Sequence, residues 1–236
     1  MLEIKHFTKK YDEYLAVDDL SLHIERGQIY GFIGHNGAGK TTTLKAIAGI
    51  LPFNDGIITI DNYSIKDDPL YCKKQLAYIP DNPDLYGYLT GIQYLNFICD
   101  VYDINQSDRK YRIETLSERF EIKDVLSKYI SSYSHGMKQK LAIISAFVHE
   151  PKLIIMDEPF VGLDPKASHV LKTMMKDFCH SGGAIFFSTH VLEVAEKLCD
   201  KIAIIKQGKL VVSGNTDELT KDESLESLFL ELEDVI

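Results

Sequence analysis

The stretch that decides the fold is Gly34-His35-Asn36-Gly37-Ala38-Gly39-Lys40-Thr41-Thr42. It fits the pattern G-x-x-x-x-G-K-S/T, with an apolar run at residues 28–33 before it and a helical pattern at residues 41–50 after it. The three glycines let successive backbone N–H groups face one anion, which the positive end of the following helix also attracts. The stretch therefore predicts a loop that binds a polyphosphate.

Two side chains of this loop have expected roles toward such a ligand. Lys40 is expected to reach the β- and γ-phosphates, and the Thr41 hydroxyl to take a place on Mg²⁺. A glycine turn that merely opens an amphipathic helix is the alternative, which is less favoured because both flanking elements are present. The expected nucleotide-binding residues of the loop are Gly34, Asn36, Gly37, Ala38, Gly39, Lys40, Thr41 and Thr42.

Length and composition narrow the class of protein. With 236 residues, 45% of them apolar, the chain can form one large α/β domain or a core with a smaller insertion. A net charge of −9 with scattered Lys and Arg argues against nucleic acid as a partner. Four widely separated cysteines indicate neither a zinc site nor a disulfide framework and suit a reducing cytosol. They are Cys72, Cys99, Cys179 and Cys199.

The sequence contains no segment expected to cross a membrane. None of its apolar runs approaches the roughly 20 residues that a spanning helix needs. Residues 1–10 do not have the pattern of a signal sequence. We therefore expect any contact with a membrane to come through a partner.

Apolar patterns predict two sheets. Short strands at residues 2–7, 20–24 and 57–61, with a turn at 54–56, indicate a small antiparallel sheet beside the loop. Continuous apolar runs are typical of parallel strands buried on both faces, and helical patterns separate them. The runs lie at residues 153–156, 184–188 and 202–205, the helices at 166–179 and 191–198, and a turn at 207–208 leads into 209–212. Residues 76–79 are another predicted apolar strand.

A helical segment interrupts the strand pattern. Residues 92–129 have charges spaced between apolar positions, and Ser134 can cap a further helix that runs to about residue 149. The predicted fold class is α/β: a P-loop ATPase core with a mostly parallel buried sheet, a small antiparallel β-subdomain and a helical insertion. We expect one domain, with its core at residues 1–86 and 150–215, a helical subdomain at 87–149 and a helical tail at 216–236.

The tail carries an apolar stripe at helical spacing. Packing of this stripe on the chain's own core is the favoured interpretation, and a helix that binds a partner is the alternative. The stripe consists of Leu225, Leu228, Phe229 and Leu232.

Two acids follow the apolar run at residues 153–156. They stand where open α/β sheets place their ligands, at the carboxyl end of a strand. An Asp at this point holds Mg²⁺ in P-loop ATPases, so Asp157 is assigned to the metal, and Glu158 is left to orient or deprotonate the attacking water. An acid pair after a strand is otherwise as often a helix cap or a solvated end. The phosphate loop makes the catalytic interpretation the better one.

Taken together, these motifs and their order resemble the ATP-binding subunit of an ABC transporter over essentially the whole chain. The resemblance implies that Tyr11 stacks on adenine and that His190 contacts the γ-phosphate as the switch histidine. Residues 133–137, Tyr-Ser-His-Gly-Met, resemble the signature L-S-G-G-Q, which implies that Ser134 and Gly136 cap ATP on the opposite subunit. Residues 161–164, Val-Gly-Leu-Asp, resemble the segment through which the two subunits communicate.

The chain departs from the family pattern at two places. Asp81 stands where the family commonly has Gln, which places a carboxyl group near the metal and the γ-phosphate, and we count it among the candidate metal ligands. In the signature, His135 replaces the first glycine and Met137 the final Gln. Ser134 and Gly136 remain, so we expect activity to persist.

The expected function is an ATP hydrolase that works as a head-to-tail pair with a second ATP-binding subunit, either another copy of this chain or a relative, and drives transport, with ATP and Mg²⁺ as cofactors. The alternative is a soluble ABC ATPase, such as one that assembles iron–sulfur clusters. A GTPase switch is disfavoured because the chain has no N-K-x-D motif, and a binding module without turnover would be expected to lack Glu158.

The resemblance also implies a membrane partner. The signature and the short insertion resemble ATPases paired with exporters of drugs, peptides or antimicrobial compounds, which implies a place on the inner face of the cell membrane. We expect the permease to dock near residues 81–90, whose apolar and tyrosine side chains should lie in an exposed turn. Packing of the insertion onto the core is the alternative role. The side chains are Leu85, Tyr86, Tyr88 and Leu89.

Overall fold

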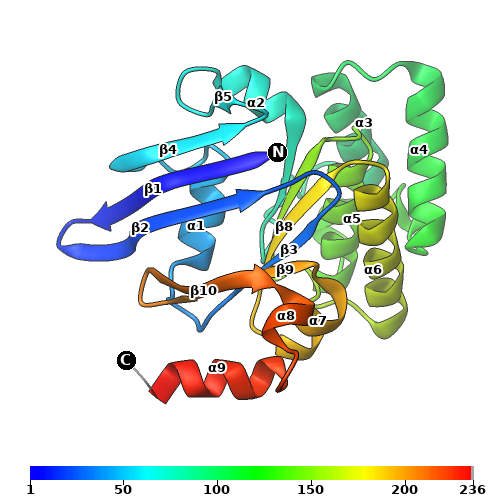
Figure 1. The fold of residues 1–236 in the computed structure, drawn as a ribbon. Coiled ribbons are helices and arrows are strands. Elements are labelled where there is room, and N and C mark those ends of the chain that lie inside the picture. The colour runs from blue at the N-terminus through cyan, green and yellow to red at the C-terminus, as the bar shows by residue number, and fades with distance from the viewer. Residues whose placement is uncertain (235–236) are drawn as a thin grey trace.

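The computed structural model describes residues 1–234 and places a six-stranded sheet in the order β10-β9-β3-β8-β7-β6 at the centre of the molecule (Figure 1). All neighbours in this sheet are parallel except the hairpin of β9 and β10. Parallel strands buried on both faces require continuous apolar sequence, as predicted. The strands are β3 Ile29–Ile33, β6 Leu76–Ile79, β7 Leu153–Asp157, β8 Ala184–Thr189, β9 Lys201–Lys206 and β10 Lys209–Asn215.

A second, antiparallel sheet has the order β2-β1-β4-β5. Strands β1 and β2 are longer than predicted, because shifts in the register of their pairing let them bend and continue. The predicted turn at residues 54–56 is wrong: Gly56 lies within β4, and a Cβ there would come 2.6 Å from the His6 carbonyl oxygen. The strands are β1 Leu2–Tyr11, β2 Tyr14–Ile24, β4 Asp55–Ile60 and β5 Tyr63–Ser64.

Alternate residues of the central strands face two different apolar layers. In β8, Phe186 packs with the antiparallel sheet and α1, whereas Phe187 packs with the helices of the opposite face. The helix after the phosphate loop, α1, ends at Ile47, earlier than expected. Helix α2 was not predicted, because it begins at Pro69 among residues that are typical of turns. The core helices are α1 Lys40–Ile47, α2 Pro69–Gln75, α6 Pro165–His180, α7 Leu192–Leu198 and α8 Thr216–Leu219.

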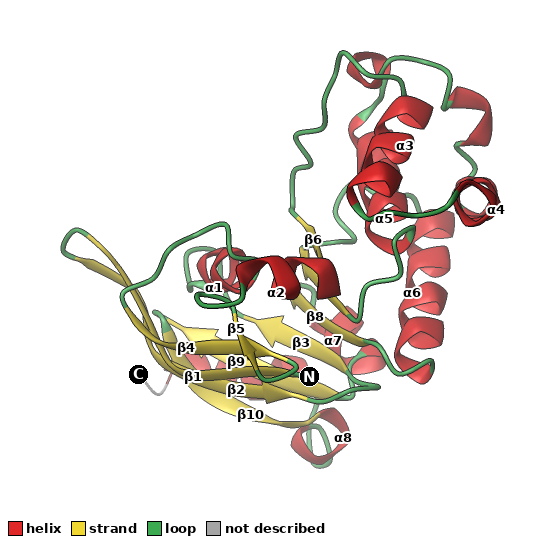
Figure 2. Cartoon of the chain, turned by 90° about the horizontal axis from the view of Figure 1, so that it is seen from above, coloured by secondary structure: helices red, strands yellow, loops and turns green. Residues whose placement is uncertain are grey.

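The helical insertion lies beyond the β6 side of the central sheet, away from the antiparallel sheet (Figure 2). Side-chain caps start its helices: Thr90 forms a capping box with Gln93, and Asn105 and Ser134 each accept a backbone N–H bond. The helices are α3 Gly91–Val101, α4 Gln106–Arg119 and α5 His135–Phe147, with 3₁₀ turns at Lys123–Val125 and Ile130–Ser132.

The tail forms α9, Leu225–Asp234. Leu225 is buried, and Leu228, Phe229 and Leu232 pack against the same core, so the interpretation of self-packing is confirmed. Residues 235 and 236 of the predicted tail lie outside the described residues. Within residues 1–234, no helix combines the length and the apolar character needed to cross a membrane.

Candidate active site

Residues 34–39 form a loop between the carboxyl end of β3 and the start of α1. A Cβ on Gly34 would lie 2.4 Å from the carbonyl oxygen of Ile205. Gly39 has a φ of +106°, and a Cβ there would lie 2.6 Å from the carbonyl oxygen of Ala16. Glycine is required at both positions because the loop lies directly on its neighbouring strands, and the left-handed backbone at Gly39 strains other residues.

Lys40 is folded into this loop. Its side chain is 6% exposed, and its Nζ donates to the carbonyl oxygens of Gly34 at 2.6 Å and His35 at 3.1 Å. Burial lowers the pKa of Lys40, while the carboxylates of Glu158 and Asp157 act in the opposite direction. The ammonium group is thus largely desolvated and held by neutral carbonyls, which an anionic ligand can replace with stronger, charge-assisted bonds.

Asp157 ends β7 as a buried carboxylate, 1% exposed. The Thr41 hydroxyl donates to Oδ2 at 2.6 Å, and the Ser188 hydroxyl donates to Oδ1 at 2.5 Å. The register of the parallel strands β7 and β8 places Asp157 beside Ser188. The sheet therefore fixes the orientation of this carboxylate toward the start of α1.

Glu158 follows in a left-handed conformation, with φ of +47°. Its backbone N–H donates to the Ser188 hydroxyl at 3.0 Å. Its Oε1 lies 2.9 Å from His190 Nδ1 and 4.0 Å from Lys40 Nζ, yet it is buried and has no aligned hydrogen bond. A strained backbone and an unsatisfied carboxylate oxygen together mark this residue as one that a ligand would complete.

These groups surround a pocket of about 280 Å³. The predicted residues Tyr11 and Asp81 both line it, and His190 reaches it through Glu158. Asp81 receives a hydrogen bond from the backbone N–H of Asn82 at 2.8 Å. The lining residues are Tyr11, Tyr14, Ala16, His35, Asn36, Gly37, Gly39, Lys40, Thr41, Thr42, Asp81, Asp157 and Glu158.

Ser134 and Gly136 do not line this pocket but lie at the start of α5. The Ser134 hydroxyl accepts from the backbone N–H of Met137 at 3.3 Å. A Cβ on Gly136 would come 2.7 Å from the Gly162 carbonyl oxygen, so this turn packs directly on residues 161–164. An ion pair of 2.7 Å between Lys140 and Asp164 joins the same two segments and lowers the pKa of Asp164.

Sequence reasoning missed several residues of the site. Tyr14 lies opposite Tyr11 in the hairpin of β1 and β2, and its hydroxyl donates to the Gly37 carbonyl at 3.4 Å. Ser188 could have been found by aligning the carboxyl ends of the predicted strands, since it follows an apolar run beside that of Asp157. The Tyr78 hydroxyl is buried without a partner, and burial and the nearby Asp157 and Asp81 raise its pKa.

Comparison with known proteins identifies the family. Residues 17–161, more than half of the chain, match the family model described as ABC transporter. The chain belongs to the ABC transporter family. It is 34% identical over 225 residues to the ABC transporter ATP-binding protein NatA of Bacillus subtilis (strain 168), which covers 95% of this chain and 92% of NatA.

A second relative and a solved structure give the same family for this ABC protein. It is 35% identical to the ABC-type transporter ATP-binding protein EcsA of the same organism, over 98% of this chain and 96% of EcsA. A solved structure described as the ATP binding subunit of an ABC transporter superposes with a TM-score of 0.95 at 36% identity, over 99% of both chains. The protein is therefore an ABC-type ATPase that binds ATP and serves as a transporter subunit.

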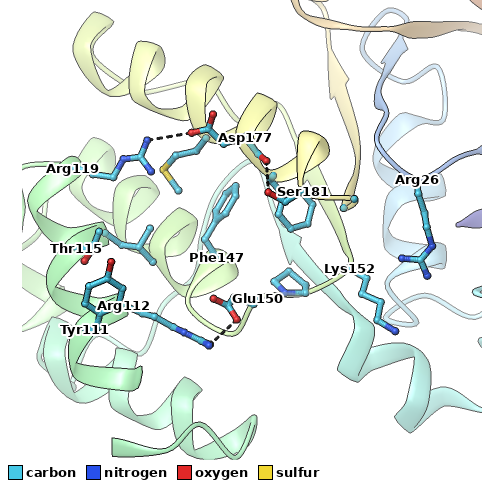
Figure 3. A pocket seen from close by; sticks show the side chains of 16 residues that line it. Arg26, Tyr111, Arg112, Thr115, Arg119, Phe147, Glu150, Lys152, Asp177 and Ser181 are labelled. Carbon is cyan, nitrogen blue, oxygen red and sulfur yellow. Dashed lines mark hydrogen bonds and ion pairs between the residues drawn. The ribbon is translucent and has the colours of Figure 1, made fainter. Parts of the chain in front are cut away.

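A second, larger groove of about 520 Å³ lies between α4, the end of α5 and α6 (Figure 3). We call it the rear groove. Arg112 forms a 2.7 Å ion pair with Glu150 there, and Arg119 lies 3.8 Å from Asp177. Its apolar lining comes from Leu116, Phe147, Pro151, Met174 and Phe178, and its other lining residues are Arg26, Tyr111, Thr115, Lys152, Ser181, Gly182 and Gly183.

Proposed function

We propose that this ATPase works as a head-to-tail pair in which each ATP is held between the phosphate loop of one chain and the signature of the other. The observation that carries the proposal is the convergence of Lys40, Asp157 and Glu158 on one pocket at the carboxyl ends of the central strands. The second chain would contribute Ser134 and Gly136, which lie outside this pocket in their own chain.

Mg²⁺ fits the polar groups beside the loop. Within residues 1–234, no group of three His, Cys, Asp or Glu side chains is arranged to hold a metal ion by itself. Mg²⁺ prefers oxygen ligands and keeps several waters, and Asp157 and the Thr41 hydroxyl supply such oxygens. The candidate ligand Asp81 lines the same pocket as Asp157, and the unpartnered Tyr78 hydroxyl lies near both carboxylates. When bound, the ion would neutralise charge on the phosphates.

The chain's own residues supply the remaining steps. Lys40 would exchange the two loop carbonyls for phosphate oxygens, which stabilises charge that develops during the reaction. Glu158 would accept a proton from the attacking water. His190, whose Nδ1 lies 2.9 Å from Glu158 Oε1, would orient the Glu158 carboxylate toward the γ-phosphate. Tyr11, at the mouth of the pocket, would stack on adenine.

The contacts between α5 and residues 159–164 support a shared site. Gln139 donates from Nε2 to the Pro159 carbonyl at 3.3 Å, and Lys140 pairs with Asp164. Because residues 159–164 directly follow Asp157 and Glu158, the signature of one chain is connected to its own catalytic acids. Closure on the partner's ATP would therefore be communicated to both sites.

Transport would follow from docking of a permease near residues 81–90, on the inner face of the membrane. The structure corrects one part of the expectation, because Leu85 and Leu89 pack against the core and are not exposed with the tyrosines. Tyr86 is partly exposed and contacts the ring of Phe97, and Tyr88 is 73% exposed. These rings offer a surface that a helix of another protein could cover.

Export is the direction we propose. A Bacillus subtilis (strain 168) relative with 33% identity over 93% of this chain and 70% of its own length is described as the linearmycin resistance ATP-binding protein LnrL. Similarity to a resistance protein supports an export role for this chain as well. The transported compound would be selected by the permease.

The shared site is tested with Glu158→Gln. The amide cannot accept a proton, so turnover should fall about 100-fold or more while ATP binding remains. Size-exclusion chromatography with ATP and Mg²⁺ should then show a dimer. The same variant carrying Ser134→Arg should stay monomeric, because the added side chain fills the surface that meets the partner's nucleotide. A monomer for Glu158→Gln with ATP bound, both alone and with its partner complex present, contradicts the proposal.

Permease docking is tested by changing Tyr86 and Tyr88 together to Ala. The double variant should keep its melting temperature and ATP affinity but lose permease-stimulated hydrolysis, because the apolar docking surface is removed. Tyr111→Ala is the matched control, since this exposed tyrosine lies on α4 beside the rear groove. A large drop in melting temperature with intact stimulation would show that the two tyrosines serve the core.

A further inference from the structure

The C-terminal helix α9 is fixed to the core near both of its ends. At its start, Leu225 is fully buried, and its N–H donates to Glu196 Oε2 on α7 at 2.9 Å. Near its other end, the Leu232 carbonyl accepts from Lys206 Nζ on β9 at 3.4 Å. Figure 1 shows α9 running beneath the core, past the hairpin of β9 and β10. Phe229 lies between the two attachments, so its position is restrained from both sides.

Phe229 packs on the phosphate loop. Its ring centroid lies 5.1 Å from that of His35, with the rings inclined at 58°. The gap that remains around this contact is only about 10 Å³, so the helix is closely packed there. The residues around the gap are His35, Ile204, Ile205, Lys206, Val211, Phe229 and Leu232.

His35 connects this contact to the nucleotide pocket. It lines the pocket, and its carbonyl accepts from Lys40 Nζ and from the backbone N–H of Ala38, each at 3.1 Å. Ile205, which lines the same gap, supports the loop at Gly34, where even a Cβ would come 2.4 Å from its carbonyl oxygen. The loop is therefore covered by β9 at Gly34 and by α9 at His35.

We infer that Phe229 is a positioning residue for ATP binding: through His35, it holds the phosphate loop in the conformation that receives the phosphates. Phe229 does not line the nucleotide pocket, so it acts through the loop and not on the ligand. A loop ordered in advance loses less conformational entropy when ATP binds, which raises affinity. The inference rests on the proposed assignment of residues 34–42 as the nucleotide loop.

The test compares Phe229→Ala with Leu230→Ala, a truncation at the neighbouring position, where the side chain is 56% exposed. Phe229→Ala should raise both the Kd for ATP and the KM about fivefold, or about 1 kcal/mol, the size of an aromatic contact. Its kcat at saturating ATP should be unchanged. Leu230→Ala should change none of these values.

Three further variants separate positioning from general packing. Phe229→Tyr keeps the ring and should therefore bind ATP as the parent protein does. Phe229→Leu keeps apolar bulk, so its melting temperature should equal that of the parent protein, but its ATP affinity should be as weak as that of Phe229→Ala. His35→Ala should weaken ATP binding at least as much as Phe229→Ala does, and the double variant should be weaker by less than the sum of the two separate effects, since both changes remove the same ring contact. Hydrogen exchange of residues 34–40 should be faster in Phe229→Ala.

Lys40→Ala serves as the reference for the loop itself. If Lys40→Ala weakens ATP binding and Phe229→Ala leaves Kd and KM unchanged, the positioning role is overturned while the loop assignment stands. If Phe229→Leu restores affinity as fully as Phe229→Tyr, the residue is only a packing residue, which also overturns the inference. If Lys40→Ala leaves the affinity unchanged, the loop assignment fails and the inference fails with it.

Discussion

The nucleotide pocket and the rear groove differ in how their charged groups are satisfied. In the pocket, Lys40 is buried on neutral carbonyls, and Glu158 Oε1 is buried without an aligned hydrogen bond although His190 Nδ1 lies 2.9 Å from it. In the rear groove, Arg112 and Arg119 are each paired with a carboxylate at the protein surface. The groove is larger, about 520 Å³ against 280 Å³. Incomplete polar partners therefore identify the ligand site better than volume does.

The two regions also differ in the elements that form them. The pocket lies at the phosphate loop and at the carboxyl ends of several strands. The sheet therefore fixes its polar groups, as the hydrogen bond from Ser188 to Asp157 shows. The rear groove lies between helix surfaces, where apolar side chains such as Phe147 and Phe178 contact each other edge to face. We expect changes in the pocket to alter ATP chemistry and changes in the groove to alter stability.

Among changes that leave the proposed ligand contacts intact, Ser188→Ala is expected to have the largest effect on stability and turnover. It removes hydrogen bonds to the buried Asp157 carboxylate and to the N–H of Glu158. Stability should fall by about 2 kcal/mol, the typical value of hydrogen bonds to charged groups, and turnover about tenfold. Chemical denaturation and an ATPase assay measure both. Unchanged turnover would show that the strand register does not position the acids.

A smaller effect is expected for Asp81→Asn, at the edge of the pocket. An amide oxygen is a weaker ligand for Mg²⁺ than a carboxylate, so half-maximal activity should require about threefold more Mg²⁺. Titration of activity with Mg²⁺ at saturating ATP measures the shift. A superimposable titration would place Asp81 outside the reach of the metal.

The sequence predicted those parts of the site that lie in short, continuous motifs. The loop at residues 34–42 and the acids after the β7 run could be located because their chemistry depends on local spacing. Contacts between distant segments could not: Ser188 beside Asp157 depends on strand register, and Phe229 on His35 depends on how the tail folds back. No local pattern contains that information.

The fold was predictable to a similar degree. The buried strands of the central sheet were predicted within a few residues, because a continuous apolar run has few other interpretations. The antiparallel sheet was less well predicted, since the bends in β1 and β2 arise from pairing between strands. In the sequence, Gly56 indicates a turn. In the structure, a glycine with a positive φ is needed at this position because β1 passes close to β4.

The measurement that tests the account most directly is the ATP affinity of Lys40→Ala beside that of Arg112→Ala. Each removes one cation, the first from the pocket and the second from the rear groove, where Arg112 also donates to the Val148 carbonyl. Lys40→Ala is expected to raise the Kd for ATP about tenfold or more. Arg112→Ala should leave it unchanged and lower only the melting temperature. Equal affinity in Lys40→Ala and the parent protein, or a loss of affinity confined to Arg112→Ala, would contradict the account.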